Sequence, residues 1–151
     1  MATFRFRAAA ALDLRRREEQ EAILARSLAE ARFREVHDAL EAERRRRETA
    51  QQTLVHVERQ GSDVDTVLWH RNWIVRLAAN IDHLVRELEA RAREVKAADR
   101  VWRDARKRRL ALERMRELAL QRFQKDELRQ EMKSMDELAR IRFAMPDSWR
   151  T

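Results

Sequence analysis

The stretch RQGSDVDTVLWHRNW, Arg59–Trp73, decides the fold, because it holds the only glycine of the 151-residue chain. Nothing in Ala8–Arg59 breaks a helix, and after Gly61 neither glycine nor proline occurs before Pro146. Glycine suits the left-handed position just past the end of a helix. The sequence therefore predicts an all-α chain, in which two long helices form an antiparallel coiled-coil hairpin with its turn at Gly61 and a C-terminal overhang of the second helix.

The composition agrees with long helices. Charged residues make up 40% of the chain, which has one glycine and one proline, too few for the turns of a compact globular fold. Ser62 is the expected N-cap of the second helix, with Asp65 three residues later as an approximate capping box. We expect one coiled-coil domain whose first helix, turn, second helix and tail span about residues 5–59, 60–63, 64–144 and 145–151.

Heptad repeats define the expected seam between the helices. In the second helix one series recurs every seventh residue, at Val67, Ile74, Ile81, Leu88, Val95 and Trp102. Intervening d positions are filled by Leu77, Leu84, Ala98, Ala105 and Leu112, and the series is broken by Arg91. The first helix is less regular: one frame is shared by Phe33, Val36, Leu40, Leu54 and Val57, and another contains Leu24 and Leu28.

With Gly61 at the tip, residue i is expected opposite roughly residue 122 − i. This rule pairs apolar residues along the whole length, Leu40 with Ile81, Leu28 with Val95, Leu24 with Ala98 and Leu12 with Leu112. It also ends the first helix opposite about residue 118, so that residues 119–145 overhang by about 40 Å at ~1.5 Å per residue. The overhang carries an apolar stripe that we expect to be an interaction surface: Phe123, Leu128, Met132, Met135, Leu138 and Ile141.

No constellation predicts catalysis. The chain has no cysteine, its four histidines lack zinc-ligand spacing, and it contains neither a Gly-rich phosphate loop nor a G-x-S-x-G elbow. His70 falls at a d position, where a packed or partly hydrated histidine is expected. A two-helix hairpin also offers no cavity that excludes water. We therefore expect no enzyme, no metal and no cofactor.

The net charge of +7 and the pI near 10.9 raise nucleic acid as a partner. Many basic residues, however, follow an acid by four positions, as in the pairs Glu41–Arg45, Glu43–Arg47 and Asp99–Arg103, which favours solvated helix faces. Three basic clusters remain, at Arg15–Arg17, Arg44–Arg47 and Arg106–Arg109. The first and last are expected side by side, either as solvated charge or as a cationic collar that contacts an acidic ring.

Trp69 and Trp73 occupy c and g positions, off the seam. They share one stripe with Arg76 and Asn80. Two interpretations stay open: the indoles fold over the turn and cap the hairpin core, or they form a docking patch, since tryptophan is enriched at binding hot spots.

Three segments carry a resemblance to a known family. They are MATFRFRAAAALDLRRREEQEA at the N-terminus, VKAADRVWRDARKRRLALERMRE at Val95–Glu117, and QEMKSMDELARIRF at Gln130–Phe143. In order, length and spacing they resemble the flagellar type III export protein FliJ. The resemblance covers nearly the whole chain.

This resemblance implies a cytoplasmic, non-enzymatic antiparallel coiled coil similar to the central stalk of rotary ATPases, located at the flagellar base. Expected partners are the hexameric export ATPase and its regulator, the cytoplasmic domain of the export gate protein, and export chaperones. The gate-binding residues implied are Trp73, Leu77, Asn80 and Leu84, with Trp69 beside them. Expected contacts with the ATPase ring are Arg106, Lys107, Arg108, Arg109, Phe123, Leu128, Met132, Met135 and Leu138.

Three alternatives remain. The chain could be the equivalent stalk of an injectisome, a basic coiled coil that binds nucleic acid, or a structural coiled coil whose 119–145 stripe self-associates. The N-terminal sequence predicts neither a signal peptide nor a membrane span.

Overall fold

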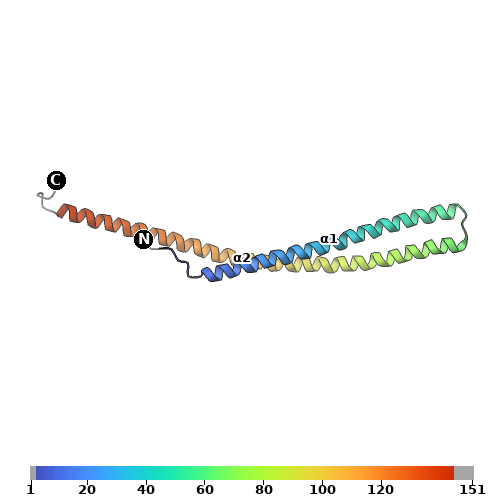
Figure 1. Ribbon diagram of the computed structural model, residues 1–151, viewed down its shortest axis with the longest axis horizontal. Coiled ribbons are helices and arrows are strands. Elements are labelled where there is room, and N and C mark those ends of the chain that lie inside the picture. The colour runs from blue at the N-terminus through green and yellow to red at the C-terminus, as the bar shows by residue number, and fades with distance from the viewer. Residues whose placement is uncertain (1–2, 145–151) are drawn as a thin grey trace. The chain divides into compact units, whose positions relative to one another are not determined.

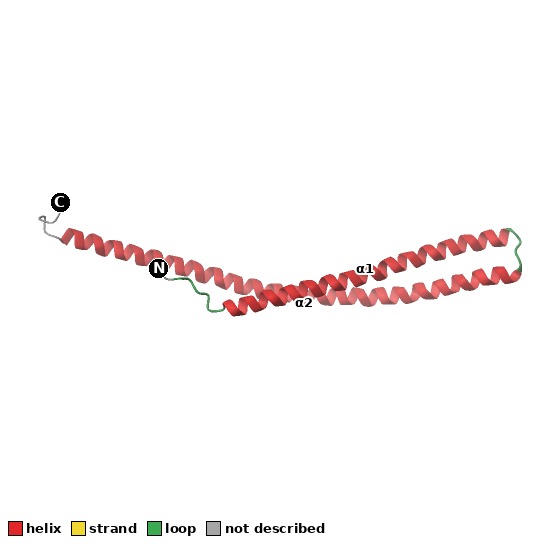
Figure 2. Cartoon of the chain, viewed as in Figure 1, coloured by secondary structure: helices red, strands yellow, loops and turns green. Residues whose placement is uncertain are grey.

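The computed structural model describes residues 3–144 and contains two helices, α1 (Ala9–Arg59) and α2 (Val64–Ala144), joined by a short connection (Figure 1). Within these residues the chain is helix and loop only, which confirms the all-α prediction (Figure 2). α1 begins at Ala9, later than the predicted start at about residue 5. The tail expected at 145–151 lies outside the described residues.

The chain divides into two compact units. Among the described residues, one unit contains 3–18 and 106–144, and the other is Glu19–Ala105. In the unit Glu19–Ala105, α1 and α2 run antiparallel from the connection (Figure 1). The single coiled-coil domain stays a prediction.

The seam predicted for α2 is confirmed by burial. Leu77, Ile81 and Ala105 are buried. Half-buried positions in the same heptad register are Val67, Ile74, Leu84, Leu88, Val95, Ala98, Trp102 and Leu112. Arg91 is also half-buried, and its guanidinium donates to Glu94 at 3.1 Å and to Glu87 at 3.5 Å. The hydrogen bond to Glu94 raises the pKa of Arg91.

The register predicted for the first part of α1 is wrong. Leu24 and Leu28 are 70% and 53% exposed, and the expected pairs with Ala98 and Val95 do not bury them. The frame predicted from Phe33, Val36, Leu40, Leu54 and Val57 instead continues through α1 in the unit Glu19–Ala105, with buried positions at Ala22, Ala29, Val36, Leu40 and Ala50. The seam positions in this part of α1 are small alanines. A prediction based on large apolar residues therefore selects Leu24 and Leu28, which lie on the outer face.

A polar cluster occupies the same seam. Arg26 stands in the heptad frame of α1, and its Nε lies 3.4 Å from the Asp99 carboxylate and 3.1 Å from that of Glu30. Its guanidinium carbon lies 4.7 Å from the centroid of the Trp102 ring. Asp99 also pairs with Arg103 at 2.8 Å, the helical spacing that the sequence predicts. Arg26 can therefore occupy a seam position, because its guanidinium group pairs with the Asp99 carboxylate and lies over the face of the Trp102 ring.

The connection has the hydrogen bonds of a Schellman motif. The Ser62 N–H donates to the Val57 carbonyl and the Gly61 N–H donates to the Glu58 carbonyl, at 3.4 and 3.2 Å. Gly61 has φ 70°, the left-handed conformation that this motif requires after a helix. The N-cap prediction is wrong by one residue: α2 begins at Val64, so Asp63 takes this position, and its carboxylate accepts the Thr66 hydroxyl.

The pairing rule is offset. It places residue 64 opposite Glu58 and residue 96 opposite Arg26, but Glu58 pairs with Arg71 and Arg26 with Asp99. Actual partners on α2 thus lie several residues further along. Side chains on a helix lean toward its N-terminus. In this antiparallel pair, α1 side chains therefore lean away from the turn and α2 side chains lean toward it. A residue on α1 thus contacts a residue of α2 that lies further from the turn.

Candidate functional site

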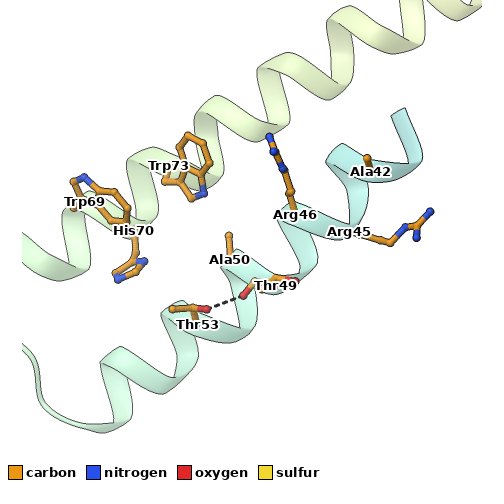
Figure 3. Close-up of a pocket in the computed structure, with 9 residues that line it drawn as sticks. All are labelled: Ala42, Arg45, Arg46, Thr49, Ala50, Thr53, Trp69, His70 and Trp73. Atoms are coloured by element: carbon orange, nitrogen blue, oxygen red, sulfur yellow. Dashed lines mark hydrogen bonds between the residues drawn. The ribbon is translucent and has the colours of Figure 1, made fainter. Parts of the chain in front are cut away.

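A groove runs along one side of the hairpin in the unit Glu19–Ala105 (Figure 3). Its volume is about 780 Å³. α1 and α2 both line it, with Ala42, Arg45, Arg46, Thr49, Ala50, Thr53, Trp69, His70 and Trp73. The groove therefore combines two indoles with two guanidinium groups.

The groove lies where the seam of α1 lacks large apolar side chains. In the heptad frame of Leu40, the next seam positions are Glu43, Arg47 and Ala50. Glu43 is half-buried, Arg47 is exposed and Ala50 is too small to span the gap. Figure 3 shows Trp73 on α2 and Ala50 on α1 at this level, with the Arg46 side chain extending from α1 toward α2. The hollow is thus a direct result of polar and small residues at seam positions.

The exposure of the indoles separates the two interpretations of the tryptophan pair. Trp69 is 62% exposed and Trp73 39% exposed. Trp69 packs edge-on against His70, with ring centroids 4.9 Å apart and planes at 89°. An indole that is mostly accessible covers little core, so the geometry favours a surface patch over a cap.

The other residues predicted to bind the gate do not share this groove. Leu77 is 3% exposed and belongs to the hairpin core. Asn80 is exposed and Leu84 half-buried, and neither lines the groove. Of the residues predicted to bind the gate, Trp69 and Trp73 therefore line the groove, and Leu77, Asn80 and Leu84 do not.

The α1 side of the groove was not among the residues predicted to bind a partner. A signal was present, since the pairing rule places residues 49 and 53 opposite Trp73 and Trp69, and both Thr49 and Thr53 line the groove. The Thr53 hydroxyl donates to the Thr49 carbonyl at 2.9 Å. Arg46 donates to Glu43 at 3.0 Å.

A second surface lies at the end of α2, in the other unit. From Leu128 to Ala144 every residue is exposed. The expected residues Leu128, Met132, Met135 and Leu138 all belong to this stretch. Phe123 does not, because its ring packs against Phe4 with centroids 5.6 Å apart and planes at 54°.

The prediction that the chain leaves everything after residue 118 uncovered is therefore wrong. Residues 3–8 precede α1 and are not helical. A non-helical backbone advances up to about 3.3–3.6 Å per residue against about 1.5 Å in a helix, so these few residues reach further along α2. The exposed stretch starts at Leu128, and at the helical rise its 17 residues extend about 25 Å.

Several arginines of the basic clusters pair with acids. Glu113 accepts hydrogen bonds from Arg16 at 3.3 Å and from Arg109 at 2.7 Å, so the first and last clusters lie next to each other. Arg106, Lys107 and Arg108 are exposed. In the middle cluster Glu41 pairs with Arg44 and Glu43 pairs with Arg46, each at a spacing of three residues. The sequence had predicted a spacing of four residues, with Arg45 and Arg47 as the partners.

Within residues 3–144 no group of three or more His, Asp or Glu side chains could hold a metal ion. Neither described helix has a stretch long and apolar enough to cross a membrane. The two surfaces present exposed apolar and charged side chains.

Comparison with known proteins identifies the family. The family model described as "Flagellar FliJ protein" matches residues 8–147. No curated protein and no solved structure matches the chain. Because the match covers nearly the whole sequence, the chain belongs to the flagellar FliJ protein family, whose members are non-catalytic components of the flagellar export apparatus.

Proposed function

We propose that this chain is the stalk of the export apparatus, which inserts into the hexameric export ATPase and couples it to the export gate. The observation that carries the proposal is the exposed apolar end of α2, Leu128–Ala144, in a chain of this family. A helix end of this kind gains stability by burial in another protein, at roughly 1.5–3 kcal/mol for each large side chain fully covered.

The ATPase-facing end has both apolar and charged groups. Leu128, Met132, Met135 and Leu138 are exposed on α2, and Arg106, Lys107 and Arg108 are exposed on the same helix closer to the hairpin. The apolar residues would enter the ring, while the basic residues would meet acidic side chains on it. With no catalytic group of its own, the stalk acts by binding one conformation of the ATPase more tightly than another.

The first test compares two substitutions at equal exposure. Met132 and Val101 are both 60% exposed, on α2, but only Met132 belongs to the proposed ATPase contact. Met132→Glu should lower the stimulation of ATP hydrolysis at least tenfold, and Val101→Glu should leave it unchanged. A chain that ends at residue 127 keeps the Phe4–Phe123 contact and should also fail to stimulate. Full stimulation by that truncated chain would refute the placement of the ATPase-facing end.

The gate-facing end is the Trp69–Trp73 groove. Tryptophans that an interface buries often dominate its binding energy, and Trp73 lines the groove. Arg45 and Arg46 add positive charge on the opposite wall. Leu77 is left out of this contact because its side chain lies in the core.

Binding to the cytoplasmic domain of the gate protein tests this end. Trp73→Ala should weaken binding at least tenfold, whereas Val75→Ala changes an exposed α2 side chain outside the groove and should have little effect. Circular dichroism should show equal helix content for both variants. Equal affinity of the two variants would exclude the groove as the gate contact.

A further inference from the structure

The groove between α1 and α2 follows the direction of the two helices. Its lining residues on α1 extend from Ala42 to Thr53, about 17 Å or three helical turns at ~1.5 Å per residue. On α2 it is lined by Trp69 and Trp73, which are four residues apart (Figure 3). Residues at this spacing lie above each other on one face of a helix. A rod-like segment that lies along the hairpin would therefore fill the groove.

A helical segment fits this groove better than an extended one. Both walls are helices, whose backbone N–H and C=O groups already bond within each helix. An extended segment would find no strand edge to pair with, so its backbone polar groups would lose water without gaining partners. A helix satisfies these groups internally. Its side chains can also pack where Glu43, Arg47 and Ala50 leave the seam of α1 without large apolar residues.

The charge of the groove is positive. None of its nine lining residues is an acid, and two of them are arginines. Arg46 pairs with Glu43 at 3.0 Å, whereas Arg45 forms no ion pair within residues 3–144. The Arg45 charge is therefore not compensated by the described part of the chain. The net charge of +7 adds a long-range attraction for an acidic partner.

We propose that the groove binds an amphipathic helix with an acidic flank, supplied by the cytoplasmic domain of the gate protein. Large apolar residues of this helix pack against the two tryptophans and Ala50, and a carboxylate on its flank pairs with Arg45. A basic helix would bring like charges together. The inference rests on the proposed gate contact for the source of the helix, while the helical form and the acidic flank follow from the groove.

Titration of the full chain with the cytoplasmic domain of the gate protein tests the acidic flank. Arg45→Glu removes no ion pair within residues 3–144, so the hairpin should stay folded, but it reverses the charge that faces the partner. It should weaken binding at least about tenfold, because like charges then meet, and the loss should be smaller in 1 M salt.

Arg32→Glu is the matched control. Arg32 is exposed on α1 and forms no ion pair within the described residues, but it lies outside the groove. The same change of charge there should alter the affinity by less than about twofold, since distant exposed charges are screened. If Arg45→Glu binds as tightly as Arg32→Glu while Trp73→Ala binds more weakly, the acidic flank is wrong and the gate contact stands.

Designed peptides test the segment without the gate protein. The probe is a fluorescein-labelled peptide of about three heptads, with leucine at a and d and glutamate at e and g, whose repulsion keeps it from pairing with itself. By fluorescence anisotropy it should bind the full chain at least about tenfold more tightly than a peptide with lysine in place of glutamate, or one with proline at its centre. Trp73→Ala should abolish this preference.

The peptide results separate the two proposals. If the lysine or proline peptide binds as tightly as the acidic one, or if Trp73→Ala leaves binding of the acidic peptide unchanged, the inferred helix site is overturned. If the acidic peptide binds as expected while Trp73→Ala leaves the affinity for the gate domain unchanged, the helix site stands and the gate protein is not the source of the helix.

Discussion

The register of α1 can be tested by two leucine-to-alanine substitutions on the same helix. Leu40 is 2% exposed and lies on the seam of the unit Glu19–Ala105, whereas Leu24 is exposed on the outer face. Removal of a buried leucine costs about 2–5 kcal/mol in transfer energy and cavity formation. A two-helix seam can partly collapse around the gap, so we expect Leu40→Ala to lower the free energy of unfolding by about 3 kcal/mol.

Leu24→Ala is the matched control. It removes the same atoms, but from a position already in contact with water, and alanine is the better helix former. The free energy of unfolding should therefore change by less than about 0.5 kcal/mol. Urea unfolding followed by circular dichroism measures both. With a denaturant slope of about 2 kcal/mol/M, Leu40→Ala should shift the midpoint by about 1.5 M and Leu24→Ala by less than about 0.3 M.

An equal loss of unfolding free energy in Leu24→Ala and Leu40→Ala would refute this register. The leucine frame inferred from the sequence places Leu24 against Ala98 in the seam. If Leu24→Ala costs as much as Leu40→Ala, the leucine frame is correct and the alanine frame of the structure is not. If neither substitution matters, the seam is not the source of stability. Only a large effect at Leu40 with a small one at Leu24 agrees with the burial observed.

Two further predictions concern stability. Gly61→Ala should lower the free energy of unfolding by about 1 kcal/mol, because a Cβ there meets no atom within 4 Å and the cost comes from φ 70° alone; Gly61→Asn should cost less, which thermal unfolding can measure. A double-mutant cycle with Arg26→Ala and Asp99→Ala should give a coupling of about 0.5 kcal/mol that decreases in 1 M salt, since both groups are partly solvated. A salt-independent coupling would mean that the Arg26–Asp99 contact is not electrostatic.

Much of the fold could be predicted because its cause is local. One glycine in 151 residues predicts where a helix can end, and Gly61 has the left-handed conformation just after α1. The heptads of α2 predict the buried positions, from Val67 to Leu112, because apolar residues recur there at most seam positions, although Arg91 interrupts the series. In α1 the frame of Phe33, Val36, Leu40, Leu54 and Val57 could be predicted in the same way. Its continuation through Ala22, Arg26 and Ala29 could not, because nothing local distinguishes a seam alanine from a surface one.

The groove and the irregular seam of α1 have the same cause, which is the polar residues at seam positions. Those positions could be predicted from the sequence, whereas the placement of the indoles could not. Glu43 and Arg47 occupy positions where a continuous coiled coil would place apolar residues, so α1 cannot close over α2 at this level. Trp73 lines the resulting groove and stays 39% exposed. The polar seam positions and the opposing threonines are visible in the sequence once the frame is known. The degree to which each indole covers the gap depends on its rotamer, which no spacing rule determines. A substitution that restores the seam, Arg47→Leu, should therefore both stabilise the hairpin and narrow the groove; if it leaves gate binding intact, the open seam is not required for the contact.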